Sequence, residues 1–474
     1  MTAATLPPRT SSPSASGRRR PLRVPPWWRD AAGSLAWASM LVVVALWLQG
    51  GGLSSFGGAG EALTTTGRLT GLVASDLLLV QVLLMARIPL VERSYGQDEL
   101  ARRHRLVGFW SFHLLLAHVA LITLGYAVTY HGASAPGVVA EFLSITLDYP
   151  GMLLALAGTL LLVLVVTTSI RAARRRLRYE SWHLLHLYAY LGVGLALPHQ
   201  LWTGADFVAN PLATVYWWGL WGTAAAAVLI FRIGLPAYRT LRHRVVVDGV
   251  VRESPDVVSV HLRGRDLHRL AAAGQFVTWR FLDGRGWSRG HPYSLSAVPT
   301  ENRMRITVKD LGDGSGGLAR LQPGTRAVVE GGYGRMHGGV RTRRKVTLLA
   351  SGIGITPLRA LLEDLPHAPG ELTLVYRARE AADLVLRAEI DTIAARTGAR
   401  VFYVLGRRTP GRAGWLPESA AHLGDAEALL RLVPDIGEHD VFVCGASGWM
   451  DAVRAAALEA GVPQENLHLE RFAW

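Results

Sequence analysis

The chain has 474 residues, of which 50 are Lys or Arg and 36 are Asp or Glu, so its formal net charge is +14. Half of the residues are hydrophobic and 18% are charged, which excludes an intrinsically disordered chain. Cys444 is the only cysteine, so the chain builds no disulfide framework, cysteine zinc site or iron–sulfur cluster of its own. Any one-electron carrier must therefore be held by ligands other than sulfur.

The first half of the chain is predicted to cross a membrane. Residues 1–29 are rich in Pro, Ser and Arg and are expected to form a disordered cytosolic tail. Most of the apolar runs that follow approach the ~20 residues needed to span the hydrocarbon layer. They are residues 35–48, 69–85, 106–128, 152–170, 184–202 and 212–233. We therefore predict a six-helix transmembrane bundle over residues 30–236; a buried soluble bundle is the alternative.

The charges between the runs predict the orientation of the bundle. Alternate connections are either nearly free of Lys and Arg, with Arg68 at the edge of one, or strongly basic. The basic ones carry Arg87, Arg93, Arg102, Arg103 and Arg105, and Arg171, Arg174, Arg175, Arg176 and Arg178. By the positive-inside rule, both termini and everything after residue 233 are cytosolic in a multi-pass plasma-membrane protein. Because no groove-reading motif accompanies the arginines, nucleic acid is not an expected partner.

The second half of the chain is predicted to form two further domains. Short β-branched runs at 245–251, 257–262, 276–281 and 303–308 predict an antiparallel β-barrel over residues 240–340. From residue 345 apolar strands alternate with helices, the strands being expected at 346–350, 372–376, 401–405 and 441–444. This pattern is typical of a doubly wound parallel α/β domain, here residues 341–474. The chain is thus predicted to be multi-domain.

Histidines concentrate in two of the apolar runs. The third run carries His104, His113 and His118, and the fifth carries His183, His186 and His199. A histidine inside a membrane is a functional candidate by default. Two haems stacked across a bilayer require one imidazole near each face from each of two helices, separated by roughly 20 Å along the helix axis.

The spacing of four of these histidines suits that requirement. His104 and His118 are separated by about 21 Å of helical rise, and His186 and His199 by about 19.5 Å. The alternation of sides predicts that His104 faces His186 near the cytosol and His118 faces His199 near the exterior. His186 and His199 do not share a face of a regular helix, so we expect an irregularity at the residues Gly192, Gly194 and Pro198.

Two alternatives remain open for the histidines. His183 could replace His186 as the inner ligand, because its separation from His199 corresponds to about 24 Å of rise. The histidines could instead only join helices through hydrogen bonds. His113 is expected to be a hydrogen-bonding or propionate-contacting group.

Two short segments of the predicted barrel contain the residue types that a flavin requires. The first is formed by His291, Pro292, Tyr293 and Ser294, which supply an aromatic face, a hydroxyl and a cationic group. The second contains Lys309, Ser315 and Gly316 in a glycine-rich turn whose backbone amides could hold phosphate. A plain turn is the alternative for the second segment.

The following domain offers a nucleotide-binding turn. Gly352, Gly354, Thr356 and Pro357 lie between a predicted strand and a helix, where glycines let phosphates approach the helix N-terminus. Arg377 and Arg379 follow the second strand, where a 2′-phosphate would lie. NADPH is therefore favoured over NADH, which stays possible; a generally arginine-rich surface is the alternative.

The last strand and the terminus add further candidates. Cys444 and Gly445 end a predicted strand, so the thiol could lie beside the nicotinamide or be an inert buried group. Phe472 and Trp474 close the sequence. A terminal aromatic ring could cover the flavin and be displaced by nicotinamide, or could pack in the ordinary way.

With these motifs in this order, residues 35–474 resemble the ferric reductase and NADPH oxidase superfamily, as a bacterial ferric-reductase-like membrane protein fused to a ferredoxin-reductase-type module. The resemblance implies two b-type haems on His104, His118, His186 and His199. It matches the flavin motif at 291–294, the Gly-x-Gly-x-Thr-Pro turn at 352–357, Cys-Gly at 444–445 and Glu-x-Phe-x-aromatic at 470–474.

The expected function is electron transfer from cytosolic NADPH through FAD and two haems to an extracytoplasmic acceptor. Ser294, Cys444 and Trp474 are the expected catalytic residues. The resemblance favours a ferric ion as the acceptor. The alternative acceptors are oxygen, which would be reduced to superoxide, a quinone, and a separate exported enzyme for which this chain would be the electron-donor subunit. A non-redox transporter or sensor is an alternative function. The sequence does not predict the oligomeric state.

Overall fold

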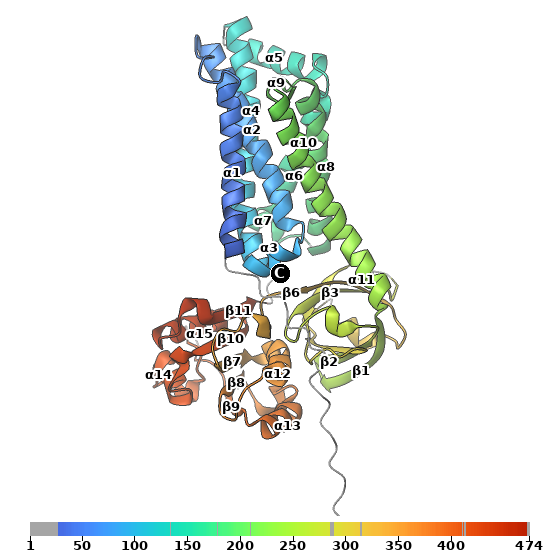
Figure 1. The fold of residues 1–474 in the computed structure, drawn as a ribbon, viewed down its shortest axis with the longest axis vertical. Helices are drawn as coiled ribbons and strands as arrows, with labels where there is room; N and C mark the ends of the chain where they lie inside the picture. The colour runs from blue at the N-terminus through green and yellow to red at the C-terminus, as the bar shows by residue number, and fades with distance from the viewer. Residues whose placement is uncertain are drawn as a thin grey trace, which may run out of the picture.

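The computed structural model describes residues 27–132, 134–177, 179–208, 210–284, 289–312, 315–409, 411 and 414–471. The chain forms an upright helical bundle with two β-containing units at one end of it (Figure 1). Helix α1 begins at Trp27 and so includes the last residues of the predicted 1–29 tail. The order of parts along the chain, helices and then two sheet-containing units, is the predicted one.

Long helices make up the bundle. They are α1 (Trp27–Gln49), α2 (Ala59–Met85), α4 (Gln97–His131), α6 (Met152–Ser169), α8 (Tyr179–Trp202) and α10 (Pro211–Ala227). Helix α10 continues through a π-helical turn, η1 (Val228–Gly234), into α11 (Leu235–His243). The short helices α3 (Pro89–Tyr95) and α7 (Arg171–Arg174) lie at the end next to the β units, and α5 (Ala135–Asp148) and α9 (Ala205–Val208) lie at the other end (Figure 1).

Five helical segments in the described part of the chain are long and apolar enough to cross a membrane. They are Trp27–Gln49, Ala59–Met85, Glu99–His131, Met152–Ser169 and Pro211–His243. Large apolar side chains such as Leu35, Leu160 and Leu212 are exposed on them, as expected of side chains that face lipid. Helix α8 is not among the five, because its histidines and Gln200 lower its hydropathy, so the sixth span remains a prediction.

Helix α8 is more regular than the sequence suggested. It is α-helical throughout, with Pro198 inside it, so the irregularity expected at Gly192, Gly194 and Pro198 is absent. The departure from α-helical geometry lies instead at Val228–Gly234, in the last span. Gly192 of α8 serves close packing: a Cβ atom on Gly158 of α6 would lie 2.6 Å from the backbone oxygen of Gly192.

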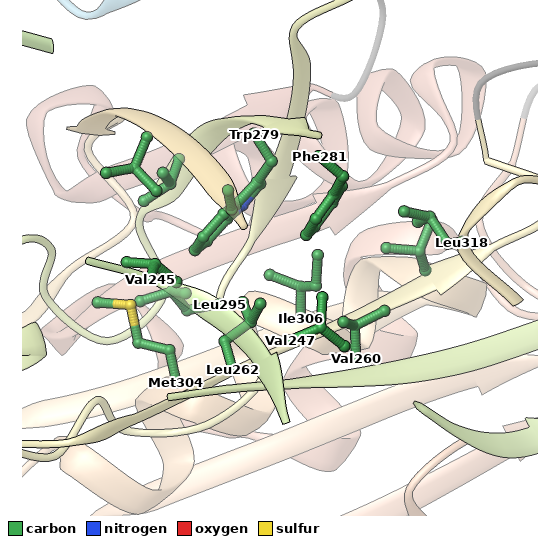
Figure 2. Close-up of a cluster of buried hydrophobic side chains, with 14 of the residues drawn as sticks. Val245, Val247, Val260, Leu262, Trp279, Phe281, Leu295, Met304, Ile306 and Leu318 are labelled. Atoms are coloured by element: carbon green, nitrogen blue, oxygen red, sulfur yellow. The ribbon is translucent and has the colours of Figure 1, made fainter. Parts of the chain in front are cut away.

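The first β unit consists of two antiparallel three-stranded sheets. One sheet has the order β1–β2–β5, with β1 (Val246–Ser254), β2 (Val257–Arg263) and β5 (Arg303–Lys309). The other sheet has the order β4–β3–β6, with β4 (His291–Ser294), β3 (Phe276–Phe281) and β6 (Ala327–Tyr333). Isolated bridges at Val246–Arg326 and Leu295–Ile306 connect them. The predicted closed barrel is therefore not confirmed, although the sheets share one core that includes Trp279, Leu295 and Ile306 (Figure 2).

The second β unit is a parallel sheet with the order β11–β10–β7–β8–β9. Its strands are β7 (Lys345–Ser351), β8 (Leu372–Ala378), β9 (Arg400–Leu405), β10 (His439–Gly445) and β11 (Leu467–Arg471). Side chains of α12 (Ile355–Asp364) and α13 (Arg387–Thr397) join the core on one face, and those of α14 (Asp425–Leu432) and α15 (Ser447–Glu459) join the core on the other. The sheet is doubly wound, as predicted.

The contact between Gly158 and Gly192 generates the first testable prediction. Gly158→Ala places a methyl group against the backbone of α8, and overpacking of this kind costs ~1–3 kcal/mol. We expect a lower unfolding temperature of the detergent-solubilised full-length chain. Gly194→Ala is the matched control, because a Cβ atom there meets no atom within 4 Å. Equal unfolding temperatures for the two variants would contradict the proposed role of this contact.

Candidate functional site

His104 and His186 form a couple at the end of the bundle that faces the β units. Their ring centroids lie 5.9 Å apart and the ring planes make an angle of 66°. Two imidazoles that bind one metal ion from opposite sides have centroids about 6 Å apart, because each metal–nitrogen bond is about 2 Å long. Nδ1 of His104 lies 3.4 Å from the carbonyl oxygen of Gln81 on α2.

Hydrogen bonds around Ser169 determine which nitrogen of His186 carries the proton. The Ser169 hydroxyl donates to the carbonyl oxygen of Val165 at 2.7 Å and accepts from Nε1 of Trp182 at 3.2 Å. Nδ1 of His186 lies 3.3 Å from the same oxygen. Since the only hydroxyl proton is already used, His186 must be the donor. Nε2 of His186 is then unprotonated, as a metal ligand requires.

His118 and His199 form the second couple, farther along α4 and α8. They are close enough for their charges to interact. Nδ1 of His118 lies 2.7 Å from the carbonyl oxygen of Gly67 on α2, which leaves Nε2 as the other ring nitrogen. A Cβ atom on Gly71 would lie 2.4 Å from the His118 ring, so that only glycine fits beside it. Backbone carbonyls and the Ser169 hydroxyl thus contact Nδ1 of three of the four rings, whereas Nδ1 of His199 is buried without a hydrogen bond in the described part of the chain.

The other two histidines of these helices lie elsewhere. His113 is exposed on α4, and its Nδ1 contacts the carbonyl oxygen of Phe109 at 2.7 Å. His183 lies within electrostatic range of Arg232, Arg280 and Glu330, and also of His186. No group of three or more His, Cys, Asp or Glu side chains that could hold a metal ion occurs among the residues that the structure describes.

Strand β4 presents the residues of the predicted flavin motif. Ser294 pairs with Phe276 of β3, and its hydroxyl is buried without a hydrogen-bond partner in the described part of the chain. The rings of His291 and Tyr293 are stacked, with centroids 6.0 Å apart; Pro292 lies between them. An orphaned buried hydroxyl beside an aromatic ring fits the edge of a bound flavin, because buried polar atoms are rarely left without a partner.

The second predicted flavin segment is engaged in local contacts. Nζ of Lys309 lies 2.9 Å from the carboxylate of Asp256. The Ser315 hydroxyl accepts a hydrogen bond from the amide of Leu311 at 2.7 Å, and a Cβ atom on Gly316 would lie 3.0 Å from the carboxylate of Asp310. These side chains hold the turn together. The amides of Ser315 and Gly316 also donate within it, both to the carbonyl oxygen of Gly312.

The predicted nucleotide turn is built around one very close backbone approach. Strands β7 and β10 are parallel neighbours, and a Cβ atom on Gly354 would lie 2.2 Å from the carbonyl oxygen of Cys444. Only glycine can occupy this position. Gly352 has φ +54°, in the left-handed region that favours glycine. The Thr356 hydroxyl donates to the carbonyl oxygen of Ile353 at 3.1 Å, and Pro357 lies in the first turn of α12.

Cys444 and Gly445 end β10 beside strand β11. Burial raises the pKa of the Cys444 thiol well above its usual range, and the neighbouring Glu470 adds to the effect, so the side chain is a neutral thiol. Cys444 is paired with Glu470 in the sheet. A Cβ atom on Gly334 would lie 2.3 Å from the Glu470 carboxylate. The end of β6 therefore meets the last strand, and the two β units adjoin here.

The arginines at the ends of β8 and β9 form a cationic cluster. Arg377 is buried and donates to the carbonyl oxygens of Ala378 and Val404. Burial lowers its pKa, and the nearby charges of Arg408 and Arg379 lower it further. Arg379 and Arg408 are exposed. No carboxylate among the described residues forms an ion pair with the cluster, so its free positive charge suits an anion. Phe472 and Trp474 lie outside the described residues.

A buried carboxylate that sequence reasoning missed joins the bundle to the first β unit. Glu330 of β6 lies 3.7 Å from Nε of Arg87, 3.6 Å from Nη1 of Arg232 and 3.4 Å from Nη1 of Arg280, and it accepts from the Tyr333 hydroxyl at 3.2 Å. Burial acts to raise the pKa of Glu330, but the arginines outweigh it and the pKa is lowered. A single Glu within an apolar strand is a weak signal of this role.

A small cleft lies beside this junction. It lies between α3, α11 and the end of β6 and has room of only about 20 Å³. Its lining includes Arg87, Arg239, Gln275 and Tyr333. Gln275 directly precedes Phe276, the partner of Ser294 in the sheet. The cleft therefore adjoins the strand that carries the flavin motif.

The comparisons with known proteins agree with this division of the chain. Residues 70–197 match the model of the ferric reductase like transmembrane component, and residues 348–455 match the oxidoreductase NAD-binding domain. The ferredoxin reductase component of 3-ketosteroid-9-alpha-monooxygenase from Mycobacterium tuberculosis (strain CDC 1551 / Oshkosh) is 32% identical over 42% of this chain and 54% of its own length. Ferredoxin--NADP reductase B from Sorangium cellulosum is 29% identical over 43% of this chain and 86% of its own length.

Among solved structures, the FAD/NAD binding domain of nitric oxide dioxygenase from Vibrio cholerae O1 biovar El Tor is similar. The identity is 23% and the TM-score 0.36, and the match covers 49% of this chain and 99% of that domain. The chain spans about half the length of the first curated relatives it matches.

Residues 348–455 are thus similar to an oxidoreductase NAD-binding domain, and the two relatives named above are a reductase and a reductase component. In chain order, a segment similar to the ferric reductase like transmembrane component precedes a segment similar to the oxidoreductase NAD-binding domain.

The close approach of Gly354 generates the second prediction. Gly354→Ala drives a methyl group into the Cys444 carbonyl and separates the two turns at the carboxyl ends of β7 and β10. We expect KM for NADPH to rise at least tenfold in a dye-reduction assay, because ~1.4 kcal/mol of lost binding is tenfold. Gly448→Ala on α15, where a Cβ atom meets nothing within 4 Å, is the control. An unchanged KM in Gly354→Ala would refute the role of this turn.

Proposed function

We propose that the chain carries electrons from cytosolic NADPH, or NADH, through FAD and two b-type haems to an acceptor on the other side of the plasma membrane. The observation that carries the proposal is the arrangement of histidines: one couple between α4 and α8 lies near the reductase module and a second lies farther along the same helices. A flavin held by the residues of β4 would supply the conversion of hydride transfer from a nicotinamide into single-electron transfer.

The proposed haem ligands are His104 and His186 for the inner group and His118 and His199 for the outer one. The carbonyl oxygens of Gln81 and Gly67 and the hydroxyl of Ser169 orient three of these rings. Bis-imidazole ligation leaves no open position on the iron, which suits electron transfer. The ring contact between His104 and His186 supports His186 over His183 as the inner ligand.

In the reductase module each proposed residue has a separate task. The free hydroxyl of Ser294 bonds to the flavin ring, and Tyr293 with His291 flanks it; Pro292 fixes the strand between them. The neutral thiol of Cys444 contacts the nicotinamide without bringing charge to it. Backbone amides at Gly352, Gly354 and Gly445 receive phosphates, and Thr356 and Pro357 shape the helix start. Lys309, Ser315 and Gly316 lie near the flavin phosphates. For Phe472 and Trp474, outside the described residues, the sequence alone supports a role in covering the flavin.

The proposed orientation rests on charge. The connections that contain Arg87 and Arg171 lie at the same end of the bundle as the reductase module (Figure 1), which supports a cytosolic position for that end and for both termini. Electrons then move outward. An inside-negative membrane potential favours this direction by about 2.3 kcal/mol per 100 mV.

The proposed acceptor is a ferric complex. A second candidate is a partner protein, because the relatives from Mycobacterium tuberculosis and Chromohalobacter salexigens are named as reductase components of monooxygenases. Oxygen is the third. A reduced-minus-oxidised spectrum with NADPH, followed by addition of ferric chelate or oxygen, tests the proposal: two b-type haems should be reduced and then reoxidised by the ferric chelate. Absence of haem from protein made with an adequate haem supply would refute the proposed function.

The ligand assignment yields a third prediction. His118→Ala should remove the outer haem and outward electron transfer while NADPH-dependent reduction of the flavin continues, because the inner couple is untouched. The haem content should fall by half, measured by pyridine haemochrome. His113→Ala on the same helix is the control and should keep both haems, since that side chain is exposed. Retention of both haems in His118→Ala would reject the assignment.

The cationic cluster yields a fourth prediction. Arg379→Ala and Arg408→Ala should each reduce the preference for NADPH over NADH about tenfold, because a hydrogen bond to a charged group contributes ~1.5 kcal/mol or more. Arg377 is a poorer choice for testing, since its guanidinium is buried among backbone carbonyls. Arg407→Ala, an exposed neighbour outside the cluster, is the control. The kcat/KM ratio for the two nucleotides is the measurement, and unaltered ratios would refute the 2′-phosphate role.

A further inference from the structure

A carboxyl group lies fully buried inside the helical bundle. Asp76 is in the middle of α2 and has 0% exposure. Along the helix it lies between Gly67 and Gln81, whose carbonyl oxygens contact His118 and His104, at about 13 Å and about 7 Å of helical rise. No ion pair joins Asp76 to a Lys, Arg or His side chain in the described part of the chain. A lone charge here would be very costly.

Three oxygen atoms form a closed triangle at this site. The distance from Ser39 Oγ on α1 to Asp76 Oδ1 is 2.5 Å, that from Tyr216 Oη on α10 to Asp76 Oδ1 is 2.9 Å, and that from Ser39 Oγ to Tyr216 Oη is 2.7 Å. Each distance is that of an O–H···O hydrogen bond. Each side of the triangle therefore needs a proton of its own.

The number of available protons decides the charge of the carboxyl group. Ser39 and Tyr216 bring one hydroxyl proton each. With a carboxylate at Asp76, two protons would have to serve three sides, and one pair of oxygens would be in contact without a hydrogen atom between them. Tyr216 Oη also lies 3.1 Å from the carbonyl oxygen of Ser39, and this contact adds a further acceptor for the same two protons. The third proton must therefore belong to Asp76.

A metal cation does not explain the cluster. Three oxygens that share one octahedral Mg²⁺ at about 2.1 Å lie about 3 Å apart, and those around the larger Ca²⁺ lie farther apart. The contacts of Ser39 with Asp76 and with Tyr216 are shorter than this. The second carboxyl oxygen, Oδ2, is buried and has no partner among the described residues, so no further ligand completes a coordination shell.

We infer that Asp76 is a proton-binding site in the interior of the membrane bundle. The carboxyl group holds its proton at neutral pH, and that proton closes the ring of hydrogen bonds that joins α1 to α2 and α10. The site is neutral, so it places no negative charge beside the electron path. This last consequence rests on the proposed function, whereas the protonation of Asp76 does not.

Infrared spectroscopy of the full-length protein in lipid nanodiscs tests the protonation directly. Asp76→Asn should remove a carbonyl stretching band of a protonated carboxylic acid and leave the carboxylate bands unchanged. Asp206→Asn is the matched control in the same domain, because Asp206 is ion-paired with Arg68 at 2.5 Å and should contribute only carboxylate bands. Loss of carboxylate intensity in Asp76→Asn, with the acid band retained, would overturn the inference.

A second variant keeps the test decisive if Asp76→Asn does not fold. Tyr216→Phe removes one hydrogen bond from the ring, so the acid band should move to higher wavenumber; an unmoved band would overturn the inference.

Redox titration separates the two proposals. If haems are present, Asp76→Asn should leave both midpoint potentials unchanged, and a rise in either would show that Asp76 is a carboxylate. If haems are absent, the proposed function fails while the infrared result still stands.

Discussion

The structure depends on the need to satisfy imidazole nitrogens inside an apolar bundle. A side-chain N–H in hydrocarbon must find an acceptor within the protein. Helix α2 supplies backbone carbonyls to His104 and His118 of α4, and α6 supplies Ser169 to His186 of α8. The pairings of α2 with α4 and of α6 with α8 are therefore fixed by the same contacts that orient the rings toward each other.

The sequence predicts much of the fold because the signals are local. Apolar runs, the alternation of basic connections and the apolar strands of the parallel sheet each depend on neighbouring residues. The observed strands of this sheet extend the predicted ones by one or two residues at most ends. Strands β4, β6 and β11 were missed, since His291–Ser294 is short and the glycines of Ala327–Tyr333 weaken its pattern. Helix α5 was missed because it is too short to resemble a span.

The candidate sites are less predictable, because they depend on residues that are distant in the sequence. Ser39, Asp76 and Tyr216 come from three helices, and no spacing rule links them. Glu330 acquires its role only when arginines of the bundle surround it. Conversely, Lys309 fits a phosphate site by type, yet it contacts Asp256. Type and spacing suggested the histidines, and the partners of the rings distinguish His186 from His183.

The last span continues as one helical rod into the first β unit. Residues from Pro211 to His243 form α10, η1 and α11 without a break, and the hydroxyl of Thr240 on α11 accepts a hydrogen bond from the amide of Val329 in β6. Inserting one residue in such a rod would turn everything beyond it by ~100° and advance it by ~1.5 Å. The length of this connection therefore sets the orientation of the first β unit on the bundle. A chain with a connection of another length would need different residues to form the Glu330 junction.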